Sequence, residues 1–345
     1  MNIFCGVQAT GRGHLSRFAV IREMLLSAGH DVYGYATGQE LPPYAQGIGQ
    51  FDPGPTFYIR NNRMHLRPTV SHNLKVLAAL PSCWRGLKRL MKESQFDRAV
   101  IDFEPVSARA ICKANVPLVI FDNQTLTLTD LPAFAMVKRD VAIMRRFVKL
   151  YYGPALMHAE KFLTYSLAPV SAGIARQTII PPCVRKEVAA LTPNRGDHIL
   201  FYSSIGEVPH GLMEFAKRNP NVEVRAYVSQ KPAGSIPRNI VLPDRNNAAF
   251  LTDFATCRAY VANAGFESIA EAVVFDKPLM VVPIGGQWEQ RINCAIVNHY
   301  GIGSVADNFT AETFERALRL ETCPPSEVRH WVSQGREMLQ NEIVP

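Results

Sequence analysis

Residues 263–272 read NAGFESIAEA and form the junction between a strand-like run and a helix-like run. The preceding run, CRAYVA at 257–262, is typical of a buried strand, and DKPLMVVP at 276–283 contains the next one. A strand, a tight turn, a helix and a further strand make up the repeating unit of a parallel sheet. The stretch therefore predicts an α/β fold. It also places its turn at the carboxyl edge of the sheet, where ligands of such sheets bind.

The rest of the chain repeats this alternation in two series. Strand-like runs occur first at 2–8, 31–36, 98–104 and 117–123, and then at 198–204, 222–229, 239–243, 257–262 and 278–283. Between the series lies QTIIPPCVRKEVAALTPNRGD, whose prolines and glycine are typical of a linker. We therefore expect two Rossmann-like α/β domains, residues 1–180 and 181–325, that face each other across a cleft.

The composition indicates a globular protein. Hydrophobic residues make up 47% of the chain and charged residues 19%, which is typical of a folded protein. No run reaches the roughly 18 apolar residues that a membrane span needs, and MNIFCGVQATGRGH predicts a strand and turn rather than a signal peptide. The seven cysteines include no C-x-x-C pair, so we expect reduced thiols, no zinc site and a cytoplasmic protein.

Basic residues are concentrated in the first half of the chain. The net charge is +7, and residues 53–92 contain many Lys and Arg but no Asp or Glu. A second basic run, MVKRDVAIMRRFVKLYYG, occupies 136–153. The two interpretations are a solvated face and a surface for an anionic partner. No zinc-finger or RNP-type motif singles out nucleic acid.

The turn after the first strand contains candidate site residues. QATGRGHLSR places Gly11, Arg12 and Gly13 between strand and helix, where glycine lets the backbone approach a ligand. The spacing is G-x-G-x-x-S, which departs from the fingerprint of a nicotinamide-cofactor site, and the sequence has no P-loop. His14 falls in the first helical turn, where a neutral imidazole suits general-base catalysis near pH 7. A capping or packed histidine is the alternative.

Three carboxylates end the later strands of the first domain. Asp102 and Glu104 belong to VIDFEP, and Asp122 belongs to IFDNQ. A carboxylate beside one ring nitrogen would orient His14 and stabilise its protonated form. Turn capping is the alternative for each of them.

The turn at 263–272 offers groups that suit a nucleotide diphosphate. Free N–H groups and the helix dipole favour an anion at a helix start. Gly265 permits close approach, Ser268 adds a hydroxyl, and Glu271 suits a ribose diol as a bidentate acceptor. The loop SSIGE adds Ser203 and Ser204 near the phosphates.

The next turn, PIGGQWEQRIN, has amide and carboxylate side chains around a helix start. Gln287, Glu289 and Gln290 are of the type that binds hexose hydroxyls. A capped glycine-rich turn explains either loop separately, but two such loops in consecutive strand–helix units favour a nucleotide-sugar site.

These residues resemble the donor-binding signature of GT-B glycosyltransferases, most strongly over residues 260–303. The blocks G-F-x-[ST]-x-x-E-A, K-P-x-x-x-x-P and Q-x-E-Q-x-x-N-A are similar to those of the family 28 C-terminal domain and of MurG-like proteins. In this chain they are carried by Gly265, Phe266, Ser268, Glu271, Ala272, Lys277, Pro278, Pro283, Gln287, Glu289, Gln290 and Asn293, with Cys294 in place of the usual small residue.

The resemblance implies a GT-B fold in which the N-terminal domain binds the acceptor and the C-terminal domain binds a nucleotide sugar, usually linked to UDP. It implies no metal and no other cofactor. It also implies that residues 326–345 form a helix that packs back on the N-terminal domain. By the same resemblance, Gly265 and Ser268 would contact the diphosphate, Glu271 the ribose, and Glu289 and Gln290 the donor sugar.

The chain departs from the related plant box, His-Cys-Gly-Trp-Asn-Ser, at several places. Asn263 replaces the histidine, which removes a phosphate donor. Glu267 puts a negative charge near the expected diphosphate. Both residues belong to the predicted donor site.

The mechanism that follows is an inverting transfer with His14 as the base. Asp102 or Asp122 would support the imidazolium, and Asp122 is preferred because it ends the more apolar strand. Two alternatives remain open, which are a nucleotide-sugar 2-epimerase on the same fold and a non-catalytic sugar-nucleotide-binding protein.

The basic segment at 53–92 favours an anionic or membrane-bound acceptor. A polyprenyl-phosphate-linked sugar or another glycolipid is the first choice, and nucleic acid is the second. A lipid acceptor would bring a cytoplasmic protein into peripheral contact with the inner face of the membrane.

Overall fold

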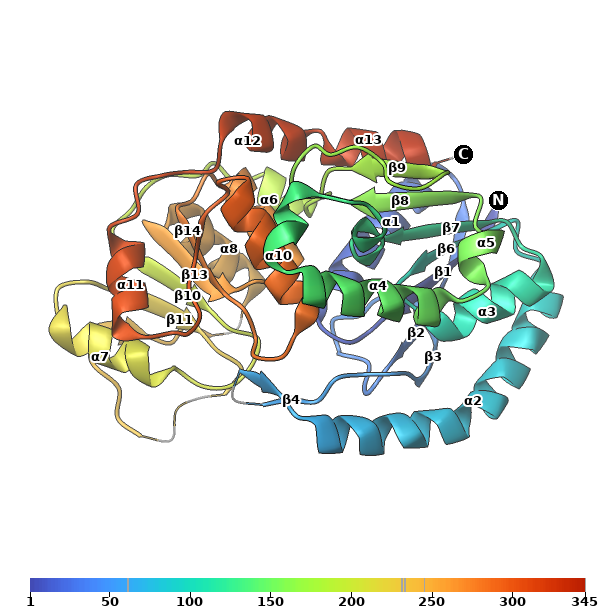
Figure 1. Ribbon diagram of the computed structural model, residues 1–345, viewed down its shortest axis with the longest axis horizontal. Coiled ribbons are helices and arrows are strands. Elements are labelled where there is room, and N and C mark those ends of the chain that lie inside the picture. The colour runs from blue at the N-terminus through green and yellow to red at the C-terminus, as the bar shows by residue number, and fades with distance from the viewer. Residues whose placement is uncertain (61, 231, 233, 245, 345) are drawn as a thin grey trace.

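The computed structural model describes residues 1–60, 62–230, 232, 234–244 and 246–344 and contains two parallel sheets (Figure 1). The larger sheet has seven strands in the order β3-β2-β1-β6-β7-β8-β9, and the smaller has six in the order β12-β11-β10-β13-β14-β15. Every strand pair within these two sheets is parallel. The predicted α/β fold with two Rossmann-like units is confirmed.

The strands of the larger sheet come from residues 2–180. Because their runs are apolar on both sides, they are covered by helices on both faces. Their bounds are β1 (Asn2–Gln8), β2 (Asp31–Gly38), β3 (Ile48–Pro53), β6 (Arg98–Asp102), β7 (Leu118–Asp122), β8 (Lys161–Tyr165) and β9 (Gln177–Ile180).

The strands of the smaller sheet come from the second half. They are β10 (Ile199–Tyr202), β11 (Val224–Tyr227), β12 (Ile240–Val241), β13 (Ala259–Asn263), β14 (Leu279–Val282) and β15 (Ser304–Val305). Below, the parts built around the larger and the smaller sheet are called the N-terminal and the C-terminal domain.

The helices connect the strands as the sequence alternation requires. The N-terminal part contains α1 (Arg12–Ser27), α2 (Leu66–Ser94), α3 (Pro105–Ala114), α4 (Lys138–Tyr152) and α5 (Ala155–His158), with two 3-10 turns, η1 (Gln124–Leu128) and η2 (Pro132–Met136). The later helices are α6 (Lys186–Ala189), α7 (His210–Arg218), α8 (Asn247–Thr256), α9 (Phe266–Val274), α10 (Trp288–His299), α11 (Ala311–Leu318), α12 (Ser326–Ser333) and α13 (Gly335–Ile343).

The two helix starts that matter most for the site are those of α1 and α9. Helix α1 buries Leu15, Phe18, Ile21 and Leu25 against the larger sheet, which is the 3.6-residue periodicity of an amphipathic helix. Its N-cap, Gly11, has φ +89°, a left-handed conformation that favours glycine. Helix α9 starts directly after β13, so its first turn lies at the carboxyl edge of the smaller sheet.

A small hairpin of the N-terminal domain reaches the C-terminal domain. It consists of β4 (Ile59–Arg60) and β5 (Arg63–Met64) and leads into α2. The backbone N–H of Met64 donates to Gly285 O at 2.9 Å, and Gly285 N–H donates to Asn62 O at 2.8 Å. The hairpin thereby adds backbone pairing between the domains, next to the loop that follows β14 (Figure 1).

The C-terminal segment contains two helices, α12 and α13, where the sequence predicted one. Helix α13 lies beside β9 of the N-terminal domain (Figure 1) and also contacts α1, whereas α12 packs on α9 of the C-terminal domain. Trp331 Nε1 of α12 donates to Ser166 O at 2.9 Å. The break falls at Gln334 because the chain passes very close to the linker there. A Cβ on Gly335 would stand 2.1 Å from Pro182 O.

In the part of the chain that the structure describes, no helix has the length and apolarity to cross a membrane.

Candidate active site

His14 and Asp102 are brought together at the carboxyl edge of the larger sheet. His14 lies in the first turn of α1, and its Nδ1 is 2.8 Å from Asp102 Oδ1 at the end of β6. The imidazole stacks on Phe103, with ring centroids 6.2 Å apart and planes inclined by 9°. Phe103 has φ +48°, so the chain turns sharply after Asp102. The His14 side chain is 13% exposed, which leaves it reachable from outside.

Asp122 does not contact His14, and the preference for it as the partner is wrong. Its carboxylate is fully buried and accepts from the backbone N–H and the hydroxyl of Thr125, at 2.8 and 2.7 Å. It also accepts from the hydroxyl of Tyr152. Burial raises the pKa of Asp122. The residue therefore caps the turn after β7 and joins it to α4.

Glu104 is likewise a capping residue and does not reach His14. It is the N-cap of α3 and accepts from the backbone N–H groups of Val106 and Ser107 at 2.8 and 2.7 Å. Thr37 Oγ1 donates to it at 3.0 Å. Its carboxylate is fully buried, so the capping alternative holds for Glu104.

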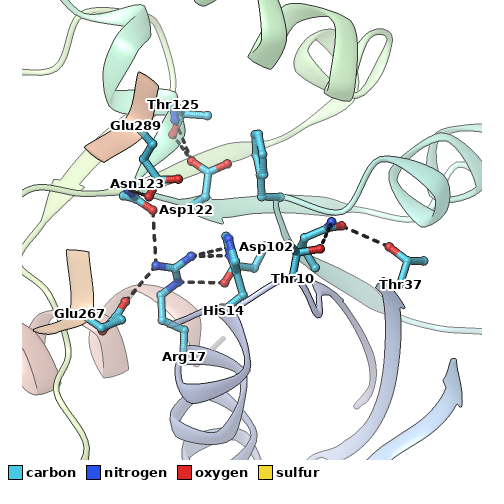
Figure 2. Close-up of polar contacts among 12 residues, drawn as sticks. Thr10, His14, Arg17, Thr37, Asp102, Asp122, Asn123, Thr125, Glu267 and Glu289 are labelled. Carbon is cyan, nitrogen blue, oxygen red and sulfur yellow. Dashed lines mark hydrogen bonds and ion pairs between the residues drawn. The ribbon is translucent and has the colours of Figure 1, made fainter. Parts of the chain in front are cut away.

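Arg17 joins these groups to the C-terminal domain (Figure 2). Its Nε and Nη2 donate to the two oxygens of Asp102 at 2.8 and 2.9 Å, and Nη2 is also 2.6 Å from His14 Nδ1. Its Nη1 donates to Glu267 at 2.8 Å. Burial alone would raise the pKa of Asp102, but the adjacent Arg17 and His14 lower it. Asp102 is therefore an ionised acceptor.

Glu267 is the residue of α9 that meets Arg17. It lies in the first turn of the helix, and a Cβ on Gly13 would be 3.2 Å from its Cγ. The first turns of α1 and α9 are therefore in contact. Burial raises the pKa of Glu267 to about 7, although Arg17 opposes this shift. The carboxylate that the sequence predicts near a diphosphate is thus paired with Arg17.

The starts of α1 and α9 both lack a side-chain cap. Neither Gly11 nor Gly265, the two N-caps, provides a side-chain cap to its helix. A Cβ on Gly265 would meet only Ser268 Oγ, at 3.5 Å, among the described atoms within 4 Å. Ser268 Oγ donates back to Gly265 O at 3.0 Å. Free N–H groups at two adjoining helix starts favour a bound anion. The side chain of Arg12 lies outside the described residues.

Ser203 and Asn263 are hydrogen-bonded to each other beside the start of α9. Ser203 Oγ donates to Asn263 Oδ1 at 2.9 Å, and Asn263 Nδ2 donates to Val282 O at 3.2 Å. The same amide donates to Asn62 Oδ1 of the hairpin at 2.9 Å. Ser204 is exposed next to them.

Glu271 lies one turn further along α9 and is paired with Arg185. Arg185 Nε and Nη2 donate to the same carboxylate oxygen, Oε1, at 3.0 and 2.7 Å. Burial raises the pKa of Glu271, and Arg185 opposes this shift. Arg185 also donates to Asn247 at 2.9 Å. Because both bonds from Arg185 end on Oε1, Oε2 is the oxygen that the ion pair leaves for a ligand.

Side chains in the first turn of α10 stabilise the loop between β14 and α10 and connect it to the N-terminal domain. Gln290 Oε1 accepts from Ile284 N–H at 2.9 Å, and Glu289 Oε1 accepts from Asn123 Nδ2 at 3.2 Å. Gln287 is the N-cap of α10, and its Oε1 is buried without a partner among the described residues. Gln290 therefore shapes the loop, whereas Glu289 joins it to the N-terminal domain.

Three residues of the interface were missed by sequence reasoning, namely Arg17, Asn62 and Asn123. Arg17 carried a signal, because residues three apart on a helix share a face and it follows His14 by three. Asn62 and Asn123 carried none, since their partners are more than a hundred positions away. Among the described residues, no group of His, Cys, Asp and Glu is arranged to hold a metal ion.

Comparisons with known proteins identify a matching family and similar folds. The model of glycosyl transferase family 1 matches residues 1–319. An uncharacterised glycosyltransferase of Methanosarcina acetivorans is 23% identical over 343 residues, which cover 88% of this chain and 85% of that protein.

Two solved structures share the fold at low sequence identity. Phytolacca americana UGT2, complexed with UDP-2-fluoro-glucose and pterostilbene, is 13% identical with a TM-score of 0.64, covering 99% of this chain and 93% of that one. The glycotransferase of kitacinnamycin is 17% identical with a TM-score of 0.61, covering 99% and 94%.

Proposed function

The chain belongs to glycosyl transferase family 1, and on that premise we propose an inverting, metal-independent transfer of a hexose from a UDP-sugar to an acceptor hydroxyl. The contact between His14 and Asp102, beside the uncapped start of α9, carries the proposal. The proposed base and the proposed anion-binding turn therefore lie at the same interface between the two domains. The more specific resemblance to family 28 stays a prediction.

In the proposed reaction, His14 Nε2 takes the proton of the acceptor hydroxyl. The acceptor oxygen forms a bond to the anomeric carbon while the bond from that carbon to the diphosphate oxygen breaks. The electron pair leaves with the diphosphate, and attack from the opposite face inverts the configuration. Asp102 stabilises the imidazolium through Nδ1, as a carboxylate does in other base dyads.

The departing diphosphate is proposed to lie at the starts of α1 and α9. Their N–H groups and helix dipoles favour the charge that develops there. Arg17 supplies a positive charge within the same interface. The ribose would bind Glu271 Oε2, and Ser203 with Asn263 would line the phosphate side. UDP is favoured because the structurally similar Phytolacca enzyme was solved with a UDP-sugar analogue.

A variant of the base tests this proposal. We expect His14→Ala to lower the rate of UDP release from a UDP-hexose, with anionic lipid extract as the acceptor source, by about 10²–10⁴-fold. UDP binding, measured by calorimetry, is expected to persist. His210→Ala is the control, because His210 is exposed on α7. Full activity of His14→Ala, or epimerised product without any acceptor, would rule out the proposed chemistry.

The acceptor is proposed to be anionic and membrane-associated because of the surface of α2. Four apolar side chains project from it at helical spacing and are 56–66% exposed. They are Leu66, Val70, Leu74 and Leu77. The exposed Arg63, Arg67 and Lys75 accompany them. An apolar stripe with basic neighbours and no acid is the pattern of a helix that lies on an anionic lipid surface.

The position of this surface suits acceptor delivery. The stripe begins at Leu66, two residues after Met64, which pairs with the donor-side loop through Gly285. A membrane under α2 would therefore lie beside the loop between β14 and α10. An acceptor headgroup rising from the membrane would enter at the interface of the two domains.

Vesicle flotation tests the membrane contact. The protein is expected to float with phosphatidylglycerol vesicles and not with phosphatidylcholine vesicles, and to be released by about 0.5 M salt. Leu74→Ser with Leu77→Ser should reduce flotation, whereas Met157→Ser should not. Met157 is the matched control, since it is 85% exposed on α5. Binding to duplex DNA instead, or to neither, would contradict the membrane proposal.

A further inference from the structure

The side chain of Gln124 is buried where the two domains meet, and its amide has no hydrogen-bond partner among the described residues. Gln124 is 2% exposed, and neither Oε1 nor Nε2 is paired. Burial takes the amide away from bulk water, so it costs free energy unless another molecule supplies a hydrogen bond. The side chain therefore requires a partner that is not part of the chain.

The local fold does not use this amide. Gln124 is the first residue of η1, and other groups hold that turn. The Asp122 carboxylate accepts from the backbone N–H of Thr125 at 2.8 Å. Thr127 Oγ1 donates to Gln124 O at 2.7 Å, and Arg145 Nε donates to Thr127 O at 2.7 Å. An apolar side chain of equal length would fill the same place without burying an amide, so the turn by itself gives no reason for glutamine.

Gln124 lines a cavity between η1 and one face of α10. Its volume of about 10 Å³ is enough for about one water molecule. Phe266 and Met144 contribute apolar walls, and the polar lining from α10 comes from Glu289 and Asn293. A buried water needs at least two polar partners, and the amide together with these side chains provides them. The cavity therefore suits a single water rather than a larger ligand.

Glu289 is the charged residue on the α10 side of this cavity. Its Oε1 accepts from Asn123 Nδ2 at 3.2 Å (Figure 2), which is longer than the usual N–H···O separation of about 2.9 Å. Its Oε2 has no hydrogen bond to a described residue. The direct contact with Asn123 therefore holds the carboxylate weakly. A water that bonds to the Gln124 amide and donates a proton to the carboxylate would supply a second hydrogen bond.

We propose that Gln124 is a positioning residue, which holds the Glu289 carboxylate toward the donor sugar through one buried water molecule. The inference rests on the proposed function and on the role that Glu289 would have toward the donor sugar. The water accepts from Nε2 or donates to Oε1, so either orientation of the amide maintains the bridge. Asn123 and Gln124 are consecutive residues after β7. The N-terminal domain thereby fixes a sugar-binding group of the C-terminal domain, and that group is in place only while the two domains are in contact.

Crystal structures of the free wild type and of Gln124→Met test the water directly. Methionine has about the length of glutamine and no amide. The wild type is expected to show one water within about 3.2 Å of both the Gln124 amide and the Glu289 carboxylate. Gln124→Met should lack this water, and its Glu289 should no longer keep one fixed position. A dry cavity in the wild type would overturn the inference, and so would an unmoved Glu289 in the variant.

A double-mutant cycle with Glu289→Ala tests the positioning role. Gln124→Met is expected to lower kcat/KM for the UDP-hexose about tenfold in the wild type, but less than about twofold in Glu289→Ala, where no carboxylate is left to hold. Calorimetric affinity for UDP should stay unchanged. Gln340→Met on the exposed side of α13 is the control, and Gln124→Leu replaces Gln124→Met if that variant does not fold. Equal losses in both backgrounds would show a merely structural role and overturn the inference.

The two measurements separate this inference from the proposed function. A protein with the water bridge that releases UDP from no UDP-hexose would refute the proposed function, and the position of Glu289 in the two crystals would still decide the role of Gln124. A protein that transfers sugar, but whose cavity is dry or whose losses are equal, would keep the proposed function and refute the role of Gln124.

Discussion

Arg17 of α1 and Glu267 of α9 form an ion pair of 2.8 Å, although 250 positions separate them in the chain. Arg17 holds Asp102 with its other nitrogens, and Asp102 contacts His14. One guanidinium thereby connects the predicted base of the first domain to the predicted phosphate-binding turn of the second. Any movement of one domain against the other must change these contacts.

The pH dependence of stability should reveal the burial of Glu267. Its pKa is raised to about 7, so the folded state binds this proton more tightly than the unfolded state. The contribution is present at low pH and is lost as the pH rises toward 7. The free energy of unfolding of Glu267→Gln, relative to the wild type, should therefore increase by about 2 kcal/mol between pH 5 and pH 8. Urea titrations measure it.

The matched control for this prediction is Glu337→Gln, an exposed glutamate in the first turn of α13. Its difference from the wild type should stay flat over the same range. A Glu267→Gln difference that also stays flat would show that the carboxylate is not buried at the interface in solution.

Asp102 and Asp122 end neighbouring strands and are both buried, so a variant of either one is a control for the same variant of the other. Asp102→Asn should lower kcat/KM by about 10²–10⁴-fold, because the imidazolium loses its counter-charge, and should shift the pH profile of kcat/KM. Asp122→Asn should lower thermal stability and leave that pH profile in place, since its partners are Thr125 and Tyr152. The reverse pattern would return Asp122 to the role of partner.

Glu271 should decide how the ribose is recognised. The wild type is expected to bind UDP about tenfold more tightly than 2′,3′-dideoxy-UDP, which corresponds to about 1.4 kcal/mol. Glu271→Gln should bind both with similar affinity, because the neutral amide accepts the diol less well. Calorimetry measures the affinity of each nucleotide for the wild type and for the variant, and these four affinities form a closed thermodynamic cycle. An unchanged preference in the variant would mean that Glu271 serves only its ion pair with Arg185.

Gly335 tests the docking of the C-terminal helices. Replacing a helical glycine by alanine usually stabilises a helix by about 1 kcal/mol, but a Cβ at this position would collide with Pro182 O. Gly335→Ala should therefore lower the melting temperature. Gly234→Ala is the control, because a Cβ there meets no described atom within 4 Å. A stabilised Gly335→Ala would indicate that α13 lies away from the linker.

The sequence predicted most of the fold because each strand–helix unit is local. The runs around Asn263 and Asp102 have the expected apolar strands, and each ends where a helix or turn begins. Helix α2, Leu66–Ser94, was not predicted from the sequence. Its basic composition was evident, but α2 exposes an apolar face as well as burying one, and neither face was predicted. The last helix divides at Gln334 because of contact with the linker, which no local pattern encodes.

The sequence predicted individual residues of the candidate site, but it did not predict which of them contact one another. His14 and the turn at Gly265 came from residue type and position. The partner of His14 could not be chosen, because Asp102 and Asp122 occupy equivalent places at the ends of adjacent strands. Their difference arises from Tyr152 and Arg17, which approach them from other elements. The charge of Glu267 is offset by Arg17, and that pairing depends on how the two domains meet.

The most direct measurement is a crystal structure of the protein with bound UDP. The account predicts the diphosphate at the start of α9, within hydrogen-bonding distance of the backbone N–H groups that follow Gly265. It also predicts the imidazole of His14 facing the same space with its Nδ1 on Asp102. Nucleotide bound away from α9, or His14 turned from the diphosphate, would contradict the account.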